Sequence, residues 1–123
     1  MGAKLVRDRM GDIPWQDEEA KKYLRPVRNS SEHFNLLHLK LMEEVGELMI
    51  ADSPHAMAEE LGDIYEVLDA MVAFINELLD EDLAESNRVR EIVRRKHQER
   101  GGFTEGLVFD MNHYQLSAPK GEV

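Results

Sequence analysis

The chain has 123 residues, with 15 Lys and Arg against 25 Asp and Glu, and its hydrophobic residues make up 42%. This length predicts one domain spanning residues 1–123, and the net charge of −10 argues against binding to nucleic acid polymers or anionic membranes. The absence of cysteine excludes disulfides and thiolate chemistry, and no apolar run is long enough to span a membrane. Because the first residues lack the apolar core of a signal peptide, we expect a cytoplasmic protein.

The first part of the chain predicts an irregular arm followed by a short helix. Residues 1–14 contain Gly11 and Pro14 among mixed charges, and we expect little regular structure in this N-terminal arm. Pro14 suits the first turn of a short helix that runs to about Leu24, where Pro26 follows as an interruption.

Two long helices are expected in the middle of the chain. The first has Ser30 or Ser31 as its N-cap and ends just before Pro54. Ser53 then caps a second helix that runs from Pro54 to about Leu79. Apolar residues follow one face of the first helix but cover most of the circumference of the second. A helix of that kind must be buried on several sides, so we expect an all-α antiparallel helical bundle completed by oligomerisation.

The last part of the chain predicts a third helix and a tail. The helix runs from about Leu83 to Arg100, with acidic residues before its start and two glycines directly after its end. Residues 104–109 suit a short strand or an extended segment, and residues 110–123 suit a mobile tail.

Two pairs of carboxylates lie on the two long helices. Glu44 and Glu47 are three residues apart on the first, and Glu60 and Asp63 are three apart on the second, so each pair shares one helix face. Antiparallel helices joined by a short turn can point both pairs at one spot, where the four groups repel unless a cation lies among them. Oxygen ligands select hard ions, which favours Mg²⁺ or Mn²⁺. The spacing alone is equally compatible with two solvated helix faces.

A glycine lies inside each acidic pair. Gly46 and Gly62 each cost a helix interior about 1 kcal/mol relative to alanine. Their placement indicates that another group approaches the helix backbone at these two positions.

Four short segments, in this order, resemble the MazG-like all-α nucleoside triphosphate pyrophosphohydrolase superfamily, which also includes phosphoribosyl-ATP pyrophosphohydrolases and dimeric dUTPases. The segments are KLVRDR (4–9), KLMEEVGEL (40–48), EELGDI (59–64) and RKHQERGGF (95–103). The first and last resemble the small stand-alone MazG-like branch. The similarity spans about residues 4–109.

The resemblance implies a metal site and a reaction. Glu44, Glu47, Glu60 and Asp63 match the metal-binding positions of the superfamily, and Glu43 matches a neighbouring acidic position that could order or deprotonate the attacking water. The implied catalytic set is thus Glu43, Glu44 and Glu47. Such enzymes use Mg²⁺, cleave a nucleoside triphosphate between the α and β phosphates to a monophosphate and pyrophosphate, and assemble as homodimers or homotetramers.

The phosphates of such a substrate also need cations from the protein. The chain has no P-loop, because its paired glycines follow a helix and lack the required spacing. Each basic residue taken singly also fits a solvated charge or a partner of a helix C-terminus. The candidate phosphate ligands are Lys40, one turn before Glu44, together with Arg95, Lys96, Arg100 and Arg7.

Three functions remain open at this point. The first is hydrolysis of nucleoside triphosphates, with house-cleaning of aberrant nucleotides as its role. The second is hydrolysis of phosphoribosyl-ATP or of dUTP and dUDP within the same superfamily. The third is a non-enzymatic helical oligomerisation or interaction module whose acidic stripe binds a basic partner.

Overall fold

The computed structural model describes residues 2–79 and 87–113. Every regular element within these two ranges is helical, so the predicted all-α class is confirmed for the described part of the chain. The chain divides into two compact units, Met1–Arg88 and Val89–Val123. The acidic residues expected to precede the third helix, and residues 114–123 of the expected tail, lie outside the described residues.

The first unit opens with the N-terminal arm, whose backbone forms two local turns. The amide of Met10 donates to the carbonyl of Arg7 at 3.1 Å, and the amide of Asp12 donates to that of Arg9 at 2.9 Å. The Trp15 indole N–H then donates to the Met10 carbonyl at 2.6 Å and fastens the end of the arm.

A short 3₁₀ helix, η1, follows at Glu18–Tyr23. The prediction of a helix from Pro14 to about Leu24 was wrong at its start. The side chain of Asp17 accepts a hydrogen bond from the Glu19 amide and caps the helix there. A capping side chain sets the first residue of a helix more firmly than a proline that is merely tolerated in a first turn.

The two long helices are α1, Ser30–Ile50, and α2, Pro54–Leu79. The predicted bounds of α2 are confirmed, with the Ala56 amide donating to Ser53 Oγ at 3.1 Å. The predicted N-cap of α1 was wrong, because Asn29 caps this helix in place of Ser30 or Ser31.

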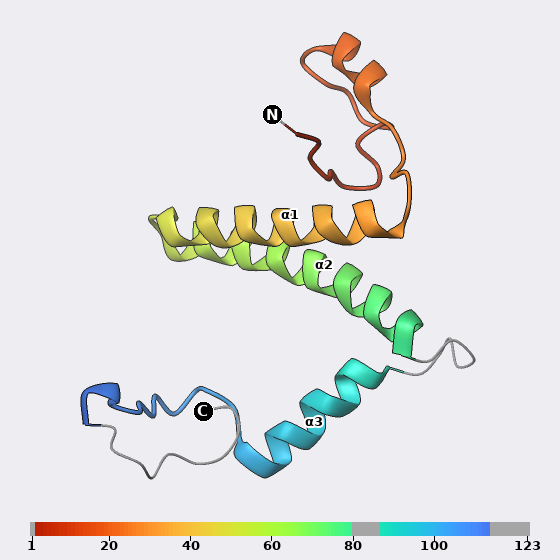
Figure 1. Cartoon of the computed structure of the whole chain (residues 1–123). Helices are drawn as coiled ribbons and strands as arrows, with labels where there is room; N and C mark the ends of the chain where they lie inside the picture. Colours follow the sequence, from red (N-terminus) through yellow and green to blue (C-terminus); the bar gives the residue numbers. More distant parts are fainter. Residues whose placement is uncertain (1, 80–86, 114–123) are drawn as a thin grey trace. The chain divides into compact units, whose positions relative to one another are not determined.

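The helices α1 and α2 run antiparallel and side by side (Figure 1). Their contact forms a thin apolar seam. Leu37 and Val67 are its buried hydrophobic residues, and Phe34 stacks on Phe74 with ring centroids 5.0 Å apart. The only buried charged residue of the described chain, Glu44, lies in the same seam. A carboxylate is thus built into the packing of the hairpin.

The second unit contains all but the first residue of α3, Arg88–Arg100, and the 3₁₀ turn η2, Met111–His113. The predicted start of this helix near Leu83 lies outside the described residues, within which the helix begins at Arg88, one residue after Asn87. The predicted glycine end is confirmed, since Gly101 has φ 78° and its amide donates to the His97 carbonyl at 2.8 Å.

The segment 104–109 forms a turn followed by irregular backbone, and no part of it is a strand. A strand needs a neighbour with which to exchange hydrogen bonds, and the described chain contains no other strand. None of the described helices combines the length and the apolar composition that a membrane crossing requires.

Candidate metal site

Five carboxylates from α1 and α2 meet in one cluster. Oxygen atoms of Glu44, Glu60 and Asp63 lie within 4.8 Å of one another, and the same holds for oxygen atoms of Glu43, Glu44 and Glu47. Because Glu44 belongs to both groups, the two sets join at its side chain. The structure thus brings together, across the hairpin, the two pairs singled out by their spacing in the sequence.

Glu44 occupies the centre of this acidic cluster and is only 4% exposed. Lys40 Nζ lies 3.1 Å from its Oε1 atom, whereas its Oε2 atom is buried and has no hydrogen-bond partner. Oε2 of Glu60 is buried without a partner as well. A buried oxygen left unpaired costs about 1–3 kcal/mol, and more when it is charged. A cation bound at this position would satisfy both oxygens, so the residues present fit a metal ion.

The crowding of these carboxylates shows in the proton affinity of Glu60. Burial, followed by the neighbouring Glu47 and Glu44, raises the pKa of Glu60 to about 7. A carboxylic acid takes up a proton at such a pH when its charged form is poorly solvated and faces like charges. The cluster therefore lacks positive charge, which a divalent ion would supply.

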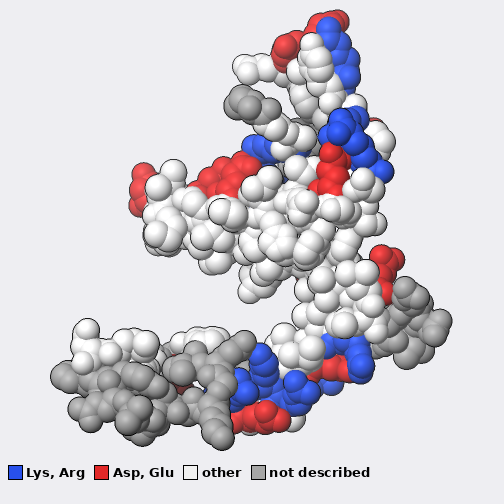
Figure 2. Space-filling model, in the orientation of Figure 1, with Lys and Arg blue, Asp and Glu red and all other residues white. Residues whose placement is uncertain are grey.

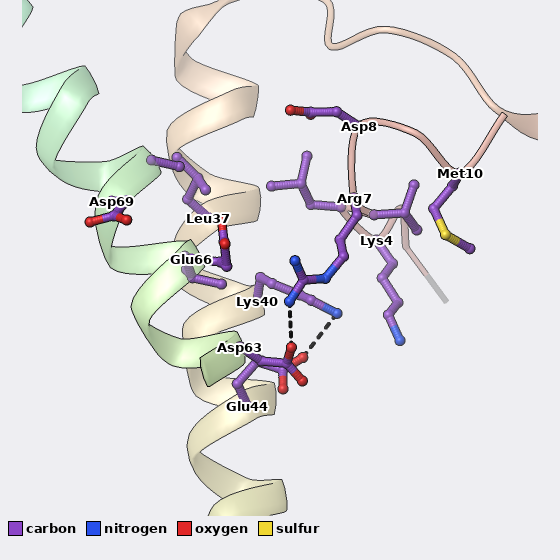
Figure 3. A pocket seen from close by; sticks show the side chains of 14 residues that line it. Lys4, Arg7, Asp8, Met10, Leu37, Lys40, Glu44, Asp63, Glu66 and Asp69 are labelled. Carbon is purple, nitrogen blue, oxygen red and sulfur yellow. Dashed lines mark hydrogen bonds and ion pairs between the residues drawn. The ribbon is translucent and has the colours of Figure 1, made fainter. Parts of the chain in front are cut away.

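Three basic side chains surround the acidic cluster. Lys40 lies 3.7 Å from Glu43 as well as near Glu44, and Lys4 of the arm lies 2.7 Å from Glu43. Arg7 of the arm pairs with Asp63 through its Nη2 atom (Figure 3). Of the predicted phosphate ligands, Lys40 and Arg7 thus reach the cluster, where each pairs with a carboxylate. These three cations face five carboxylates, so negative charge remains in excess.

The arm also changes the acidity of Glu43. The hydrogen bond from Lys4, with a further contribution from Lys40, holds the pKa of Glu43 below its ordinary value. The same contact raises the pKa of Lys4. While Lys4 is in place, Glu43 is therefore a weaker proton acceptor than an unpaired glutamate.

The remaining predicted phosphate ligands belong to the second unit. Arg95, Lys96 and Arg100 are on α3 in the second unit, whereas every residue of the acidic cluster belongs to the first. Their role in phosphate binding stays a prediction.

A cavity of about 620 Å³ adjoins the acidic cluster, a size that suits a small organic ligand. The arm, α1 and α2 each contribute to its wall. Asp63, Glu44, Lys40 and Arg7 gather at one part of it, and Asp8 and Asp69 lie away from them (Figure 3). Apolar side chains complete the lining, namely those of Leu5, Val6, Met10, Leu37, Val67 and Ala70.

The sequence did not predict that Lys4 contacts the acidic cluster. It also did not predict that Asp8, Glu66 and Asp69 line the adjoining cavity. A signal for Lys4 was available, because Lys4 and Arg7 are three residues apart in one motif of the arm. Nothing in the arm predicts where it lies, since an irregular segment has no hydrophobic period that could assign it a buried face.

The two helix glycines face open space. No heavy atom outside the local backbone lies within 4 Å of a Cβ atom built at Gly46 or at Gly62. The expected close approach to the backbone is therefore not made by any described residue of this chain.

No family model, no curated protein and no solved structure matches this chain. The likeness to the MazG-like superfamily accordingly stays a hypothesis based on the four sequence motifs.

Proposed function

We propose that this protein is a Mg²⁺-dependent nucleotide pyrophosphohydrolase of the MazG-like type. The observation that carries the proposal is the environment of Glu44. Its carboxylate is buried, one of its oxygens has no hydrogen-bond partner, and it belongs to both sets of residues that could hold a metal ion. A structure rarely retains such a group unless binding or catalysis uses it. The adjoining cavity supports a small-molecule substrate over a macromolecular one.

The ligands of the metal would be Glu44, Glu47, Glu60 and Asp63, with Mn²⁺ as an alternative to Mg²⁺. When bound, the ion supplies positive charge that polarises the phosphoryl oxygens. Lys40 adds a fixed positive charge from one helical turn before Glu44, and in this role it holds the polyphosphate beside the carboxylates.

The proposed reaction is hydrolysis of the anhydride between the α and β phosphates. The oxygen of a water molecule forms a bond to phosphorus, the bridging P–O bond breaks, and a nucleoside monophosphate and pyrophosphate leave. Glu43, at the edge of the acidic cluster, orders this water and accepts its proton. Its pairing with Lys4 opposes that role, so Glu43 must lose this partner before it acts as a base.

We also propose that a second copy of the chain covers the outer side of the α1–α2 hairpin, giving a homodimer or homotetramer. Leu39, Met42, Met49 and Ile50 are between 58% and 82% exposed and recur at helical spacing on α1. Gly46 lies between them on the same side, where no described residue approaches the position of a Cβ atom. Figure 2 shows a broad part of the hairpin surface with few charges.

A copy of the hairpin suits this face better than α3 does. The composition of α3 is mostly charged, and its apolar residues are confined to Val89, Ile92 and Val93. Such a helix offers too little apolar surface to cover both long helices.

The proposed activity is tested by pyrophosphate release from a panel of nucleoside triphosphates, phosphoribosyl-ATP, dUTP and dUDP, with Mg²⁺, Mn²⁺ or EDTA. We expect metal-dependent release from a triphosphate and none in EDTA. Glu44→Gln should lower kcat/KM by at least about a hundredfold. Glu59→Gln is the matched control, because Glu59 is an exposed neighbour of Glu60 that pairs with His55 outside the cluster.

The panel also separates the alternatives. Release from phosphoribosyl-ATP or from the deoxyuridine nucleotides alone would retain the reaction class and change the substrate. No release from any compound, by protein shown to be folded and to bind Mn²⁺, would contradict the enzyme and favour the helical interaction module.

A further inference from the structure

The N-terminal arm contacts the acidic cluster through two exchangeable ion pairs. Lys4 pairs with Glu43 and Arg7 with Asp63, and both basic side chains are 59% exposed. The backbone hydrogen bonds of the arm close its own turns, and within the described residues none connects residues 2–13 to α1 or α2. The polar attachment of the arm to the helices therefore consists of side-chain contacts.

The packing around the arm is open on two sides. Residues 4–8 line the cavity of about 620 Å³ beside the acidic cluster and also a second cavity of about 630 Å³. The second cavity lies among the arm, the segment 23–27 that precedes α1, and the first turns of α1. A segment with space on both sides can shift without breaking a close-packed core.

Metal binding and the arm compete for the same carboxylates. Glu43 and Asp63 each belong to one of the two groups whose oxygens can hold an ion. A divalent cation and a basic side chain a few ångströms apart repel each other, whereas an exposed ion pair contributes little to stability. The balance therefore favours release of Lys4 and Arg7 when a divalent ion binds.

We propose that Lys4 and Arg7 are exchangeable counter-ions, which leave Glu43 and Asp63 when a divalent cation binds and then bind phosphate oxygens of the nucleotide. The second step rests on the proposed function. Both side chains line the cavity beside the acidic cluster, where the phosphates of a bound nucleotide would lie. A guanidinium binds phosphate with two parallel hydrogen bonds, so Arg7 gains a stronger partner than the one it leaves.

The exchange also assigns a use to the pairing of Lys4 with Glu43. Departure of Lys4 removes the ammonium group that lies 2.7 Å from the Glu43 carboxylate and so leaves this oxygen accessible to another group. The arm thus offsets part of the negative charge of the acidic cluster at rest and completes the substrate site afterwards.

Limited trypsin digestion of the full chain tests the exchange, because trypsin cleaves after Lys and Arg. Cleavage after Arg7 should be slow in EDTA and about fivefold faster in Mg²⁺, the factor expected for loss of weak ion pairs. It should become slow again when Mg²⁺ is combined with an α,β-methylene nucleoside triphosphate. Cleavage after Arg94 on α3 is the internal reference. Equal rates after Arg7 in all three conditions would overturn the proposal.

Substitution of one arm residue gives a second test. Arg7→Gln should bind Mn²⁺ about two- to fivefold more tightly in the absence of nucleotide, because a competitor is removed. With Mn²⁺ present, it should bind the methylene analogue about tenfold more weakly, because a charge-assisted hydrogen bond is lost. Arg9→Gln removes the same charge from the same arm, and Arg9 pairs with no carboxylate of the acidic cluster, so both affinities should stay within twofold.

Failure of the exchange and failure of the proposed hydrolase have different signatures. If Arg7→Gln behaves like Arg9→Gln while the wild-type chain binds Mn²⁺ and releases pyrophosphate, the exchange is wrong and the hydrolase stands. If the digestion pattern and the affinities change as expected without pyrophosphate release, the exchange stands and the hydrolase is wrong. No Mn²⁺ binding by the folded wild-type chain would contradict both.

Discussion

Neighbouring carboxylates in the acidic cluster differ in proton affinity because they have different partners. Lys4 and Lys40 lower the pKa of Glu43, whereas burial, Glu47 and Glu44 raise the pKa of Glu60 to about 7. Groups of one chemical kind whose pKa values diverge are typical of sites that bind ions or move protons. This divergence within one cluster makes Glu43 and Glu60 candidates for ion binding or proton transfer.

Removal of one negative charge from the acidic cluster should stabilise the metal-free protein. We expect Glu60→Gln to raise the midpoint of thermal unfolding in EDTA by a few degrees, because it relieves repulsion with Glu44 and Glu47. We also expect Mg²⁺ to stabilise the wild-type chain and to have little effect on the variant. Thermal unfolding with and without Mg²⁺ measures both changes.

The control for this experiment is Glu59→Gln, which should keep the Mg²⁺ stabilisation of the wild type. A Glu60→Gln variant that is less stable in EDTA than the wild type would show that the cluster is compensated without a metal.

The carboxylates could be predicted from the sequence because their arrangement is local. A spacing of three fixes two side chains on one helix face, and a short turn brings the second pair beside the first. Lys4 could not be placed in the same way. It reaches Glu43 from 39 positions away along an irregular segment, and no periodic pattern encodes such a contact.

At the scale of elements, the start of α1 depends on a network that extends beyond one capping residue. Asn29 accepts a hydrogen bond from the Glu32 amide at 2.8 Å. Glu32 in turn accepts from the Arg28 amide at 2.9 Å and from both terminal nitrogens of Arg25. Asn29, Ser30 and Ser31 are all residue types that favour an N-cap, and the hydrogen bonds of Glu32 select Asn29 among them. The signal was present as Asn29 followed three residues later by Glu32.

This network gives the stability of α1 a defined dependence on pH. Arg25, followed by the Arg28 amide, lowers the pKa of Glu32 from 4.5 to about 2. A group with a depressed pKa stabilises the fold above its unfolded pKa, and this contribution is lost as the pH falls through the folded pKa. Glu32→Gln should therefore be less stable than the wild type at pH 7, and the difference should shrink as the pH falls from about 4.5 towards 2.

Urea unfolding at a series of pH values measures this difference. Glu77→Gln is a suitable control, because Glu77 is exposed on α2 and lies far along the chain from the start of α1. A constant gap between the Glu32→Gln variant and the wild type from pH 7 to pH 3 would contradict the assigned role of Glu32.

Of the two alternatives predicted for residues 104–109, the strand is absent, and the segment is a turn followed by irregular backbone. Residues Leu107, Val108 and Phe109 have strand-forming side chains, yet a short apolar run specifies no partner for its backbone.

At the scale of the whole molecule, the described chain buries very few side chains. Leu37, Val67 and Glu44 are its buried residues, although α2 is apolar around most of its circumference. A two-helix hairpin offers one seam, and its outer surfaces stay exposed unless other helices cover them. The apolar circumference of α2 was enough to predict from the sequence that these helices need further partners to cover their outer surfaces.

A charge on the outer face should separate the proposed copies. We expect Met49→Glu to shift the protein from an oligomer to a monomer. Met49 is 80% exposed on the proposed interface, and a glutamate there would place a charged carboxylate among apolar side chains. Light scattering after size exclusion measures the mass. Met111→Glu in the second unit is the control, since Met111 is also well exposed and should leave the mass unchanged. A wild-type chain that is already monomeric would contradict the proposed assembly.

The short connection between α1 and α2 has a consequence for the order in which the molecule forms. Residues 51–53 join the helices, and the four expected metal ligands lie between residues 44 and 63. Closing so short a loop costs little entropy, and contacts near in sequence form early. We therefore expect the carboxylates to meet before the rate-limiting step of folding, so that their mutual repulsion slows folding. Mg²⁺ should then accelerate folding more than it slows unfolding, which stopped-flow refolding with Mg²⁺ or EDTA measures.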